Sequence, residues 1–251
     1  MGHGIASTRT RVSGSKFLFF MPTVFITGAN RGLGLEFARQ YAADGWRVFA
    51  TCRKPADAHT LRSLGPAVSL HALDVRDSAA VRALAAQLEG ESFDVFVANA
   101  GVMTTTPAKR QDEIDEPAWL EAFRVNAVAP LACACAFVGH VARSGERKML
   151  AMSSWTGSIS SNTTGGHYAY RASKAALNAL WRSFALDHPE IIAAVLSPGP
   201  MRTDMTRYDA ARWESLPLPE EHISRLRAII ARLTPTDSGG FFHFTGEQLP
   251  W

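Results

Sequence analysis

The sequence has few cysteines and no cluster of metal ligands. Its 251 residues include 3 cysteines, Cys52, Cys133 and Cys135, which are too few for a disulfide framework. Cys133 and Cys135 lie in an Ala-rich helical run without a second ligand pair nearby, and the 8 histidines are scattered. We therefore expect three small buried thiols, no metal site and a reducing, cytoplasmic compartment.

The sequence also lacks an excess of charge of one sign and a long apolar run. Its 26 Lys and Arg residues and 23 Asp and Glu residues give a formal net charge of +3, with the positive residues scattered. We expect neither a nucleic-acid partner nor a membrane surface. No stretch approaches the roughly 18 apolar residues of a membrane span. With 47% hydrophobic residues, the chain is typical of one soluble domain that buries a core.

The N-terminal residues lack the periodicity of the rest. Residues 1–16 are rich in Gly, Ser, Thr and Arg, and the apolar run 17–20 follows them. This run is too short for the core of a signal peptide, Pro22 interrupts it, and no cleavage site of small residues follows. We expect residues 1–20 to form a disordered extension and residues 21–251 to form the folded domain.

Short apolar segments alternate with amphipathic ones along residues 21–251. This βαβ order predicts a single-domain, Rossmann-like α/β fold, a doubly wound parallel sheet of about seven strands flanked by helices. Ligands bind such folds at the carboxyl ends of the strands. The expected strands are 23–27, 47–51, 68–73, 93–97, 149–152, 191–196 and 241–244, and the main helices are about 32–44, 79–88, 116–142, 170–187 and 219–233.

The first expected strand leads into the glycine-rich turn Gly28-Ala29-Asn30-Arg31-Gly32-Leu33-Gly34. A strand, a glycine turn and a helix N-terminus form a phosphate cradle, because main-chain N–H groups and the helix dipole face a dinucleotide pyrophosphate. The spacing is G-x-x-x-G-x-G rather than the dehydrogenase G-x-G-x-x-G. Any strand-to-helix connection can require glycine, so the position directly after the first strand is what favours a dinucleotide.

The second expected strand ends at Cys52-Arg53 without an acidic residue. In dinucleotide-binding folds an acid at this position binds the ribose 2′-hydroxyl, whereas an arginine accommodates a 2′-phosphate. Arg53 and Arg31 can both reach this corner. The alternative is a pair of solvated surface arginines, but the missing acid together with two bases predicts NADP(H) rather than NAD.

Three further strand ends carry candidate cofactor contacts. The Asp74 carboxylate, followed by Val75, can meet the adenine edge, and the small residues Asn99-Ala100-Gly101 let a ribose lie against the next strand end. The segment Pro198-Gly199-Pro200-Met201-Arg202-Thr203 predicts a rigid turn. Thr203 either binds the nicotinamide amide or caps the next helix.

A tyrosine and a lysine stand four residues apart in the expected helix 170–187. Residues at i and i+4 share a helical face, so Tyr170 and Lys174 can point into one cleft. A lysine cation stabilises a phenolate and lowers the tyrosine pKa toward the working range. Ser154, at the end of an apolar strand, can donate to a substrate carbonyl oxygen. The alternative for Tyr170 alone is a half-buried aromatic residue.

Asn126 is a polar residue within an apolar helical stretch, one turn before Pro130. Its side chain can bond backbone groups that a bend leaves free, or a water molecule. From the residues alone, this capping or kink-satisfying role and a part in catalysis remain equally open.

With these motifs identified, the chain resembles the short-chain dehydrogenase/reductase family over about residues 22–251. The resemblance implies that Tyr170 is the general acid, Lys174 tunes its pKa and binds the cofactor ribose, Ser154 holds the carbonyl and Asn126 keeps a proton-relay water. The motifs in family order are Thr27-Gly28-x-x-x-Gly32-x-Gly34, Asp74-Val75, Asn99-Ala100-Gly101, Asn126, Ser153-Ser154, Tyr170-x-x-x-Lys174 and Pro198-Gly199-x-x-x-Thr203.

The loop before Tyr170 and the Leu249-Pro250-Trp251 end look like the C-factor/sniffer-like carbonyl reductase subgroup. Two departures stand out. Ala98 replaces the first Asn of the usual Asn-Asn-Ala-Gly, and the gap from Ser154 to Tyr170 is longer than usual in the family. The choice of Ser154 over Ser153 depends on this alignment and on alternation along the strand. Tyr168 is a competing phenol without a lysine at i+4.

The motifs predict an NADPH-dependent oxidoreductase that reduces a ketone or aldehyde or oxidises the alcohol, with Trp155, Met103 and residues 204–219 shaping an apolar pocket. An NADP-binding signalling or regulatory protein with little catalysis is the alternative, and an extended epimerase/dehydratase is a third. By analogy we expect a homodimer or homotetramer formed through the helices bearing Asn126 and Tyr170. The expected cofactor-binding residues are Gly28, Asn30, Arg31, Gly32, Leu33, Gly34, Arg53, Asp74, Val75, Asn99, Ala100, Gly101, Tyr170, Lys174, Pro198, Gly199, Met201 and Thr203.

Overall fold

The computed structural model describes residues 21–103, 114–207 and 210–251. Seven strands, each parallel to its neighbours, form one sheet in the order β3-β2-β1-β4-β5-β6-β7. This confirms the predicted doubly wound parallel sheet. The expected disordered extension, residues 1–20, lies outside the described residues. The strands are β1 Thr23–Ile26, β2 Arg47–Cys52, β3 Val68–Ala72, β4 Val95–Ala98, β5 Lys148–Met152, β6 Ile192–Ser197 and β7 Phe241–His243.

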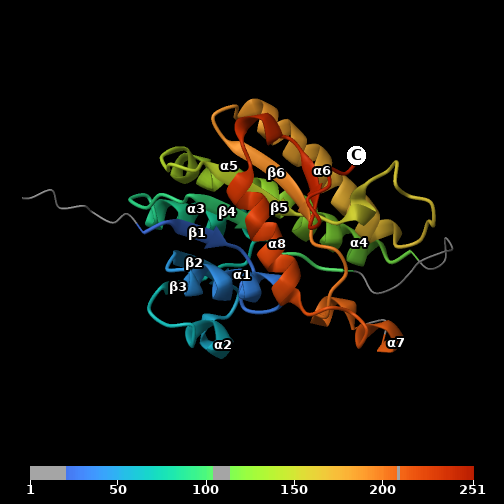
Figure 1. The fold of residues 1–251 in the computed structure, drawn as a ribbon, viewed down its shortest axis with the longest axis horizontal. Coiled ribbons are helices and arrows are strands. Elements are labelled where there is room, and N and C mark those ends of the chain that lie inside the picture. Colours follow the sequence, from blue (N-terminus) through green and yellow to red (C-terminus); the bar gives the residue numbers. More distant parts are fainter. Residues whose placement is uncertain (1–20, 104–113, 208–209) are drawn as a thin grey trace, which may run out of the picture.

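Helices cover both faces of the sheet (Figure 1). Because side chains alternate along a strand, Phe25 of β1 packs with α3, α5 and α6, whereas Val24 and Ile26 pack with α1, α2 and α8. Helix α4 continues into α5, and α7 is a single short turn. The helices are α1 Gly32–Ala43, α2 His59–Arg62, α3 Ser78–Gln87, α4 Glu116–Phe123, α5 Ala129–Ala142, α6 Tyr168–Asp187, α7 Ala210–Trp213 and α8 Pro219–Arg232.

The expected helix 116–142 is continuous but changes its winding. A π-helical turn, Arg124–Val128, joins α4 to α5 and contains Asn126. In the described residues this stretch, Glu116–Ala142, is long and apolar enough to cross a membrane by length and composition, because an 18-residue window within it has a mean hydropathy of 1.7. The expectation that no segment approaches a span was therefore wrong on composition. However, 56% of the apolar window is buried inside the fold, where Phe137 and Val141 join the core, as in a core helix.

One cysteine differs from its expected environment. Cys52 and Cys133 are buried as predicted, but Cys135 is exposed. Two residues along a helix turn a side chain by roughly 200°, so Cys133 faces the sheet while Cys135 faces outward from α5. The Ala-rich composition of α5 concealed this difference, because small residues mark no apolar stripe.

Candidate active site

The parallel sheet brings the predicted motifs to one edge, because each follows the carboxyl end of a strand. Helix α6 and the π-helical turn supply the remaining candidates. The strand-end residues are Gly28 after β1, Arg53 after β2, Asp74 after β3, Asn99 after β4, Ser154 after β5 and Pro198 after β6.

The glycine-rich turn is fixed to the end of β4 by two side chains. Thr27 Oγ1 accepts hydrogen bonds from the main-chain nitrogens of Asn99 and Ala100, each at 3.0 Å. Asn99 Nδ2 donates to the main-chain oxygens of Thr27 at 3.0 Å and Gly28 at 3.1 Å. Asn99 thus supports the strand end and the turn, and the substitution of Ala98 for the usual Asn leaves this support intact.

The turn has the geometry of a phosphate cradle. Gly28 has φ +65°, and a Cβ there would lie 3.0 Å from Ala100 Cα. Within the described residues no side chain caps the N-terminus of α1, and its first turn carries no acid, whereas Asp77 and Asp115 cap α3 and α4. The first N–H groups of α1 are therefore available to an anion, so these residues fit the pyrophosphate of a dinucleotide.

Gly34 is the position in this cradle that tolerates a side chain least. A Cβ there would lie 2.5 Å from both Asn99 Nδ2 and the Gly28 main-chain oxygen. We expect Gly34→Ala to lower the free energy of unfolding by about 1–3 kcal/mol, as overpacking does, and to weaken NADPH binding. Thermal unfolding and NADPH titration measure both effects. Gly90→Ala is the matched control, because no described residue lies within 4 Å of its Cβ position. Equal unfolding free energies and equal NADPH affinities of the two variants would contradict the phosphate cradle.

The corner expected to receive adenosine contains a network of ion pairs. Arg53 is exposed at the end of β2. Arg76 donates to the Asp74 carboxylate through Nε at 2.9 Å and Nη2 at 2.5 Å, which lowers the pKa of Asp74 to about 2. Arg31 instead pairs with Asp204 at 3.6 Å. An adenine contact of Asp74 would thus share a carboxylate that already binds Arg76.

Tyr170 and Lys174 lie on one face of α6, as predicted. Lys174 Nζ is 5.7 Å from the centroid of the Tyr170 ring and donates to the Met152 main-chain oxygen at 2.8 Å. The side chain is buried, and burial lowers the lysine pKa to about 8. At neutral pH the group therefore keeps its charge, and this places a cation beside the phenol.

Ser153 and Ser154 point to opposite sides of the segment after β5. Ser153 is buried and donates to Asn178 Oδ1 at 2.7 Å, so its hydroxyl is engaged within the protein. Ser154 is half-buried and accepts from Thr156 Oγ1 at 2.8 Å. Among the described residues Ser154 acts only as an acceptor, so its own proton is available. The alternation that favoured Ser154 is present in the structure.

Asn126 binds backbone groups outside its own helix, and its part in catalysis stays a prediction. Its Oδ1 accepts from the main-chain nitrogen of Val102 and its Nδ2 donates to the Val102 oxygen, both at 2.8 Å. Nδ2 also donates to Ser173 Oγ at 3.0 Å. Asn126 therefore fixes the segment after β4 rather than the bend of its own helix. A Cβ at Gly101 would lie 3.3 Å from Asn126 Oδ1 and 3.7 Å from Lys174 Nζ, so the amide is close to the ammonium group.

Thr203 has the second of its two expected roles, and its contact with the nicotinamide amide stays a prediction. It caps the short 3₁₀ turn Asp204–Thr206, and its main-chain nitrogen donates to Thr206 Oγ1 at 3.0 Å. Upstream, Gly199 has φ +71° and packs under Phe244. His222 Nδ1 of α8 forms a hydrogen bond with the Pro198 main-chain oxygen at 2.8 Å. The His222 ring stacks on the Phe244 ring, with the two centroids 3.8 Å apart. No sequence pattern indicated His222, because its partners Pro198 and Phe244 are distant in the chain.

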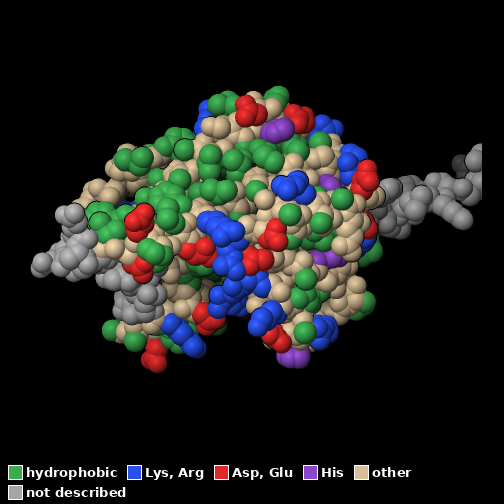
Figure 2. Space-filling model, turned by 180° about the vertical axis from the view of Figure 1, so that it is seen from behind, with side chains coloured by type: hydrophobic (Ala, Val, Ile, Leu, Met, Phe, Trp, Pro, Cys, Tyr) green, Lys and Arg blue, Asp and Glu red, His purple; other side chains and the backbone are tan. Residues whose placement is uncertain are grey.

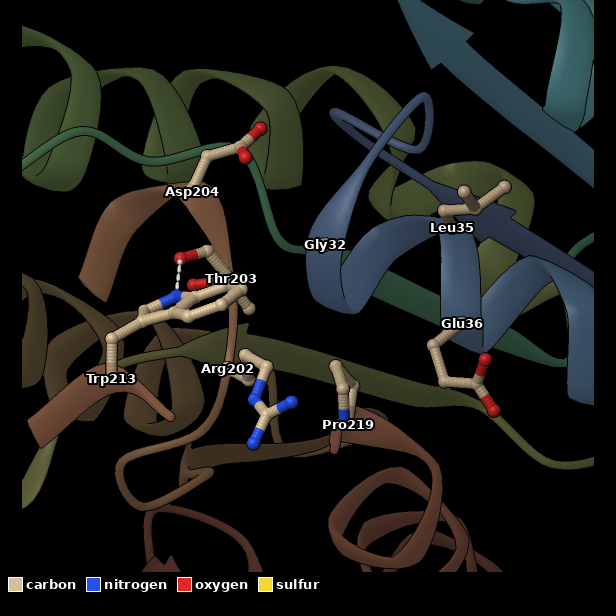
Figure 3. A pocket seen from close by; sticks show the side chains of 8 residues that line it. All are labelled: Gly32, Leu35, Glu36, Arg202, Thr203, Asp204, Trp213 and Pro219. Atoms are coloured by element: carbon tan, nitrogen blue, oxygen red, sulfur yellow. Dashed lines mark hydrogen bonds between the residues drawn. The ribbon is translucent and has the colours of Figure 1, made fainter. Parts of the chain in front are cut away.

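A pocket of about 330 Å³ opens between the start of α1 and the segment after β6 (Figure 3). The Trp213 ring forms one wall, with Nε1 donating to the Thr203 oxygen at 3.0 Å. The guanidinium carbons of Arg202 and Arg207 lie 5.0 Å and 5.1 Å from the centroid of the Trp213 ring. The pocket therefore adjoins the phosphate cradle rather than Tyr170. Its lining is Gly32, Leu35, Glu36, Arg202, Thr203, Asp204, Trp213 and Pro219.

Comparison with known proteins identifies the family. Residues 22–213 match the model of the short chain dehydrogenase family. The chain belongs to this family. The chain is 36% identical to the C-signal of Myxococcus xanthus over 173 residues, 68% of this chain and 100% of that protein. Family membership makes it an NAD(P)-dependent oxidoreductase.

Solved structures agree with the fold of this dehydrogenase. The carbonyl reductase Sniffer of D. melanogaster has a TM-score of 0.83 at 31% identity, covering 92% of this chain and 100% of that one. The NADPH-bound carbonyl reductase from chicken fatty liver has a TM-score of 0.82 at 29% identity, covering 92% and 99%. These likenesses confirm the resemblance to the C-factor/sniffer-like carbonyl reductases.

Proposed function

We propose that this dehydrogenase uses NADP(H) to interconvert a ketone or aldehyde and its alcohol, with Tyr170 as general acid and base. The observation that carries the proposal is the Lys174 ammonium 5.7 Å from the Tyr170 ring centroid, on the same edge of the sheet as Ser154 and the uncapped N-terminus of α1. The NADPH-bound carbonyl reductase relative supports the cofactor.

Each residue has a separate part in the proposed reaction. NADPH supplies the hydride when it is bound. The Tyr170 hydroxyl transfers its proton to the substrate oxygen, and the Ser154 hydroxyl donates a hydrogen bond to the same oxygen as negative charge develops there. The Lys174 cation favours the phenolate that remains on Tyr170. Asn126 holds the segment beside Lys174, and retention of a relay water there stays a prediction.

The cofactor preference is proposed to come from the bases at the end of β2. Arg53 follows the strand directly, and no acid stands there to bind a 2′-hydroxyl. Arg31, on the glycine-rich turn, is close enough to Asp204 to form an ion pair. A 2′-phosphate would offer both guanidinium groups a more highly charged partner.

A panel of aldehydes, ketones and quinones with NADPH or NADH tests this function. We expect turnover with NADPH and little with NADH. In Arg53→Ala the preference should fall about tenfold, the value of one charge-assisted hydrogen bond. Arg143→Ala is the control, because this arginine bonds the main-chain oxygens of Glu89 and Glu91 at the opposite edge of the sheet. An unchanged preference in Arg53→Ala contradicts the assignment.

A signalling role is the second candidate, and the identity of 36% to the C-signal favours it. The panel of aldehydes, ketones and quinones distinguishes the two functions. NADPH binding without consumption of either cofactor across the panel supports signalling, whereas turnover supports the reductase.

We also propose a cytoplasmic homodimer or homotetramer. Leu120 of α4, Val128 of the π-helical turn and Leu186 of α6 are 61%, 58% and 67% exposed. Figure 2 shows hydrophobic side chains gathered on the face seen from behind. Burial of such residues in a pair of subunits would remove apolar area from water. Sedimentation equilibrium tests the assembly, and a monomer at micromolar concentration contradicts it.

A further inference from the structure

The C-terminal residues turn back from the last strand toward the candidate active site. Leu249 donates through its main-chain nitrogen to the Phe241 oxygen at 2.7 Å, and Phe242 forms an antiparallel bridge with Gln248. The Trp251 ring then stacks on the buried Phe241 ring, with the centroids 5.5 Å apart and an interplanar angle of 18°. The tail is thus bound to β7 by both backbone and ring contacts.

The main-chain oxygen of Trp251 accepts three hydrogen bonds from one short loop. The donors are Ser158 Oγ at 3.2 Å, Ser160 Oγ at 2.7 Å and the Ser160 main-chain nitrogen at 3.1 Å. Ser158 is buried and its hydroxyl also contacts Ser161 Oγ at 2.9 Å. A single acceptor therefore joins the tail to two hydroxyl groups and one amide of this loop.

The loop begins at the serine proposed to bind the carbonyl. The 3₁₀ turn Trp155–Gly157 separates Ser154 from Ser158. Within it the Gly157 nitrogen donates to the Ser154 oxygen at 2.8 Å and the Ser158 nitrogen to the Trp155 oxygen at 3.0 Å. Thr156 Oγ1 donates to Ser154 Oγ at 2.8 Å. This last bond occupies a lone pair of Ser154 and leaves its proton to donate elsewhere.

The same turn packs against the catalytic lysine. A Cβ at Gly157 would lie 2.9 Å from Lys174 Cβ, so the turn and α6 are in direct contact. The turn is also fixed from β6, because Ser197 Oγ accepts from the Trp155 nitrogen at 2.8 Å. The tail contacts the other end of the turn, where Ser158 leaves it. Helix α6 holds the turn as well, because Asn178 Nδ2 donates to the Gly157 oxygen at 3.3 Å, and the tail adds a further attachment at Ser158.

We propose that residues 249–251 are a positioning element for Ser154, acting through Ser158, Ser160 and the 3₁₀ turn. This inference rests on the proposed reductase function. The tail sets the direction of the Ser154 hydroxyl, and a small misplacement of such a donor weakens its bond to the substrate oxygen in the transition state.

The test removes the two hydroxyl hydrogen bonds between the tail and the loop, keeps the one from the Ser160 main-chain nitrogen, and leaves Tyr170 and Lys174 unchanged. In the double variant Ser158→Ala/Ser160→Ala we expect kcat to fall about tenfold, while the NADPH dissociation constant and the thermal midpoint stay near those of the unmodified chain. Deletion of residues 249–251 should lower kcat at least as much. Ser160→Thr keeps a hydroxyl and should retain activity. Ser183→Ala is the control, because within the part of the chain that the structure describes this exposed hydroxyl bonds Ala179 of its own helix.

Two results would overturn the proposal. One is a kcat within about twofold of the unmodified chain in both the double variant and the deletion. The other is a parallel loss of NADPH affinity, thermal midpoint and kcat that Ser160→Thr shares, since that pattern indicates general loss of structure. Turnover by the unmodified chain tests the reductase function separately. Failure of the reductase function can therefore be distinguished from failure of the positioning role of residues 249–251.

Discussion

Tyr170→Phe should reduce kcat by about a hundredfold to ten-thousandfold, the usual contribution of a general acid. The substitution removes one oxygen and leaves the ring beside Lys174, so the packing of α6 is preserved. We expect NADPH to bind with an affinity within about twofold of the unmodified chain, because only the proton donor is lost. Steady-state turnover and NADPH fluorescence titration measure the two quantities.

Tyr168→Phe is the matched control for this experiment. Tyr168 is the first residue of α6 and is exposed, and the residue four positions later is Ala172 rather than a lysine. The control should keep full activity. If Tyr168→Phe lost activity and Tyr170→Phe kept it, the general acid would be the earlier phenol, and the role of Lys174 would fall with the assignment.

Lys174→Met should lower kcat by about a hundredfold, because the phenolate of Tyr170 loses its neighbouring cation. Methionine has a similar length and no charge, so it suits the buried site. Lys148→Met is the control. Lys148 is also buried, but it lies at the beginning of β5 and pairs with Glu146 at 2.6 Å, at the edge of the sheet away from Tyr170. Equal turnover losses in both variants would indicate general disruption and would contradict a specific role.

Lys174→Met should also change how the free energy of unfolding depends on pH. Burial lowers the pKa of Lys174 from 10.5 to about 8, so the folded chain releases this proton at lower pH than the unfolded chain. Between these values the unfolded state binds more protons, and stability rises with pH. We expect the unfolding free energy of the unmodified chain, relative to Lys174→Met, to increase by on the order of 3 kcal/mol across this range. Urea unfolding at pH 7, 8, 9 and 10 measures it.

A difference that stays constant with pH would contradict the lowered lysine pKa. Comparing two chains is necessary because other groups titrate in the same range. Burial raises the pKa of Cys133 to about 12, and this effect lowers stability as the pH rises above the ordinary thiol value. Cys133 is present in both chains, so its contribution cancels in the difference.

The features that could be predicted from the sequence are those set by residues close together in the chain and by the order of the strands. Tyr170 and Lys174 share a face because four residues make about one helical turn. The strand-end motifs meet because parallel strands end at one edge. Ser154 could be preferred over Ser153 by alternation, and the structure shows the physical reason in the bond from Ser153 to Asn178.

Contacts between distant segments could not be read from the sequence. His222 and Trp251 contact segments of the site from far along the chain. The Leu249-Pro250-Trp251 end indicated a subgroup but not this contact. Asp74 was expected to meet adenine, but Arg76 two residues later binds its carboxylate. Asn126 lies in a π-helical turn, which directs its amide to Val102, and no periodicity of apolar residues predicts such a turn.

Several connections of this molecule differ in how much change they can accept during evolution. The turn that leaves β1 and the start of α1 hold the crowded glycines Gly28 and Gly34, whose Cβ positions meet main-chain atoms. The connections that enter β2, β3 and β4 hold Gly45, Gly65 and Gly90, and among the described residues nothing lies within 4 Å of a Cβ at any of these three. Insertions and new binding loops can therefore accumulate before β2, β3 and β4 without disturbing chemistry at the opposite edge of the sheet. One scaffold can in this way acquire new partners while its reaction stays the same.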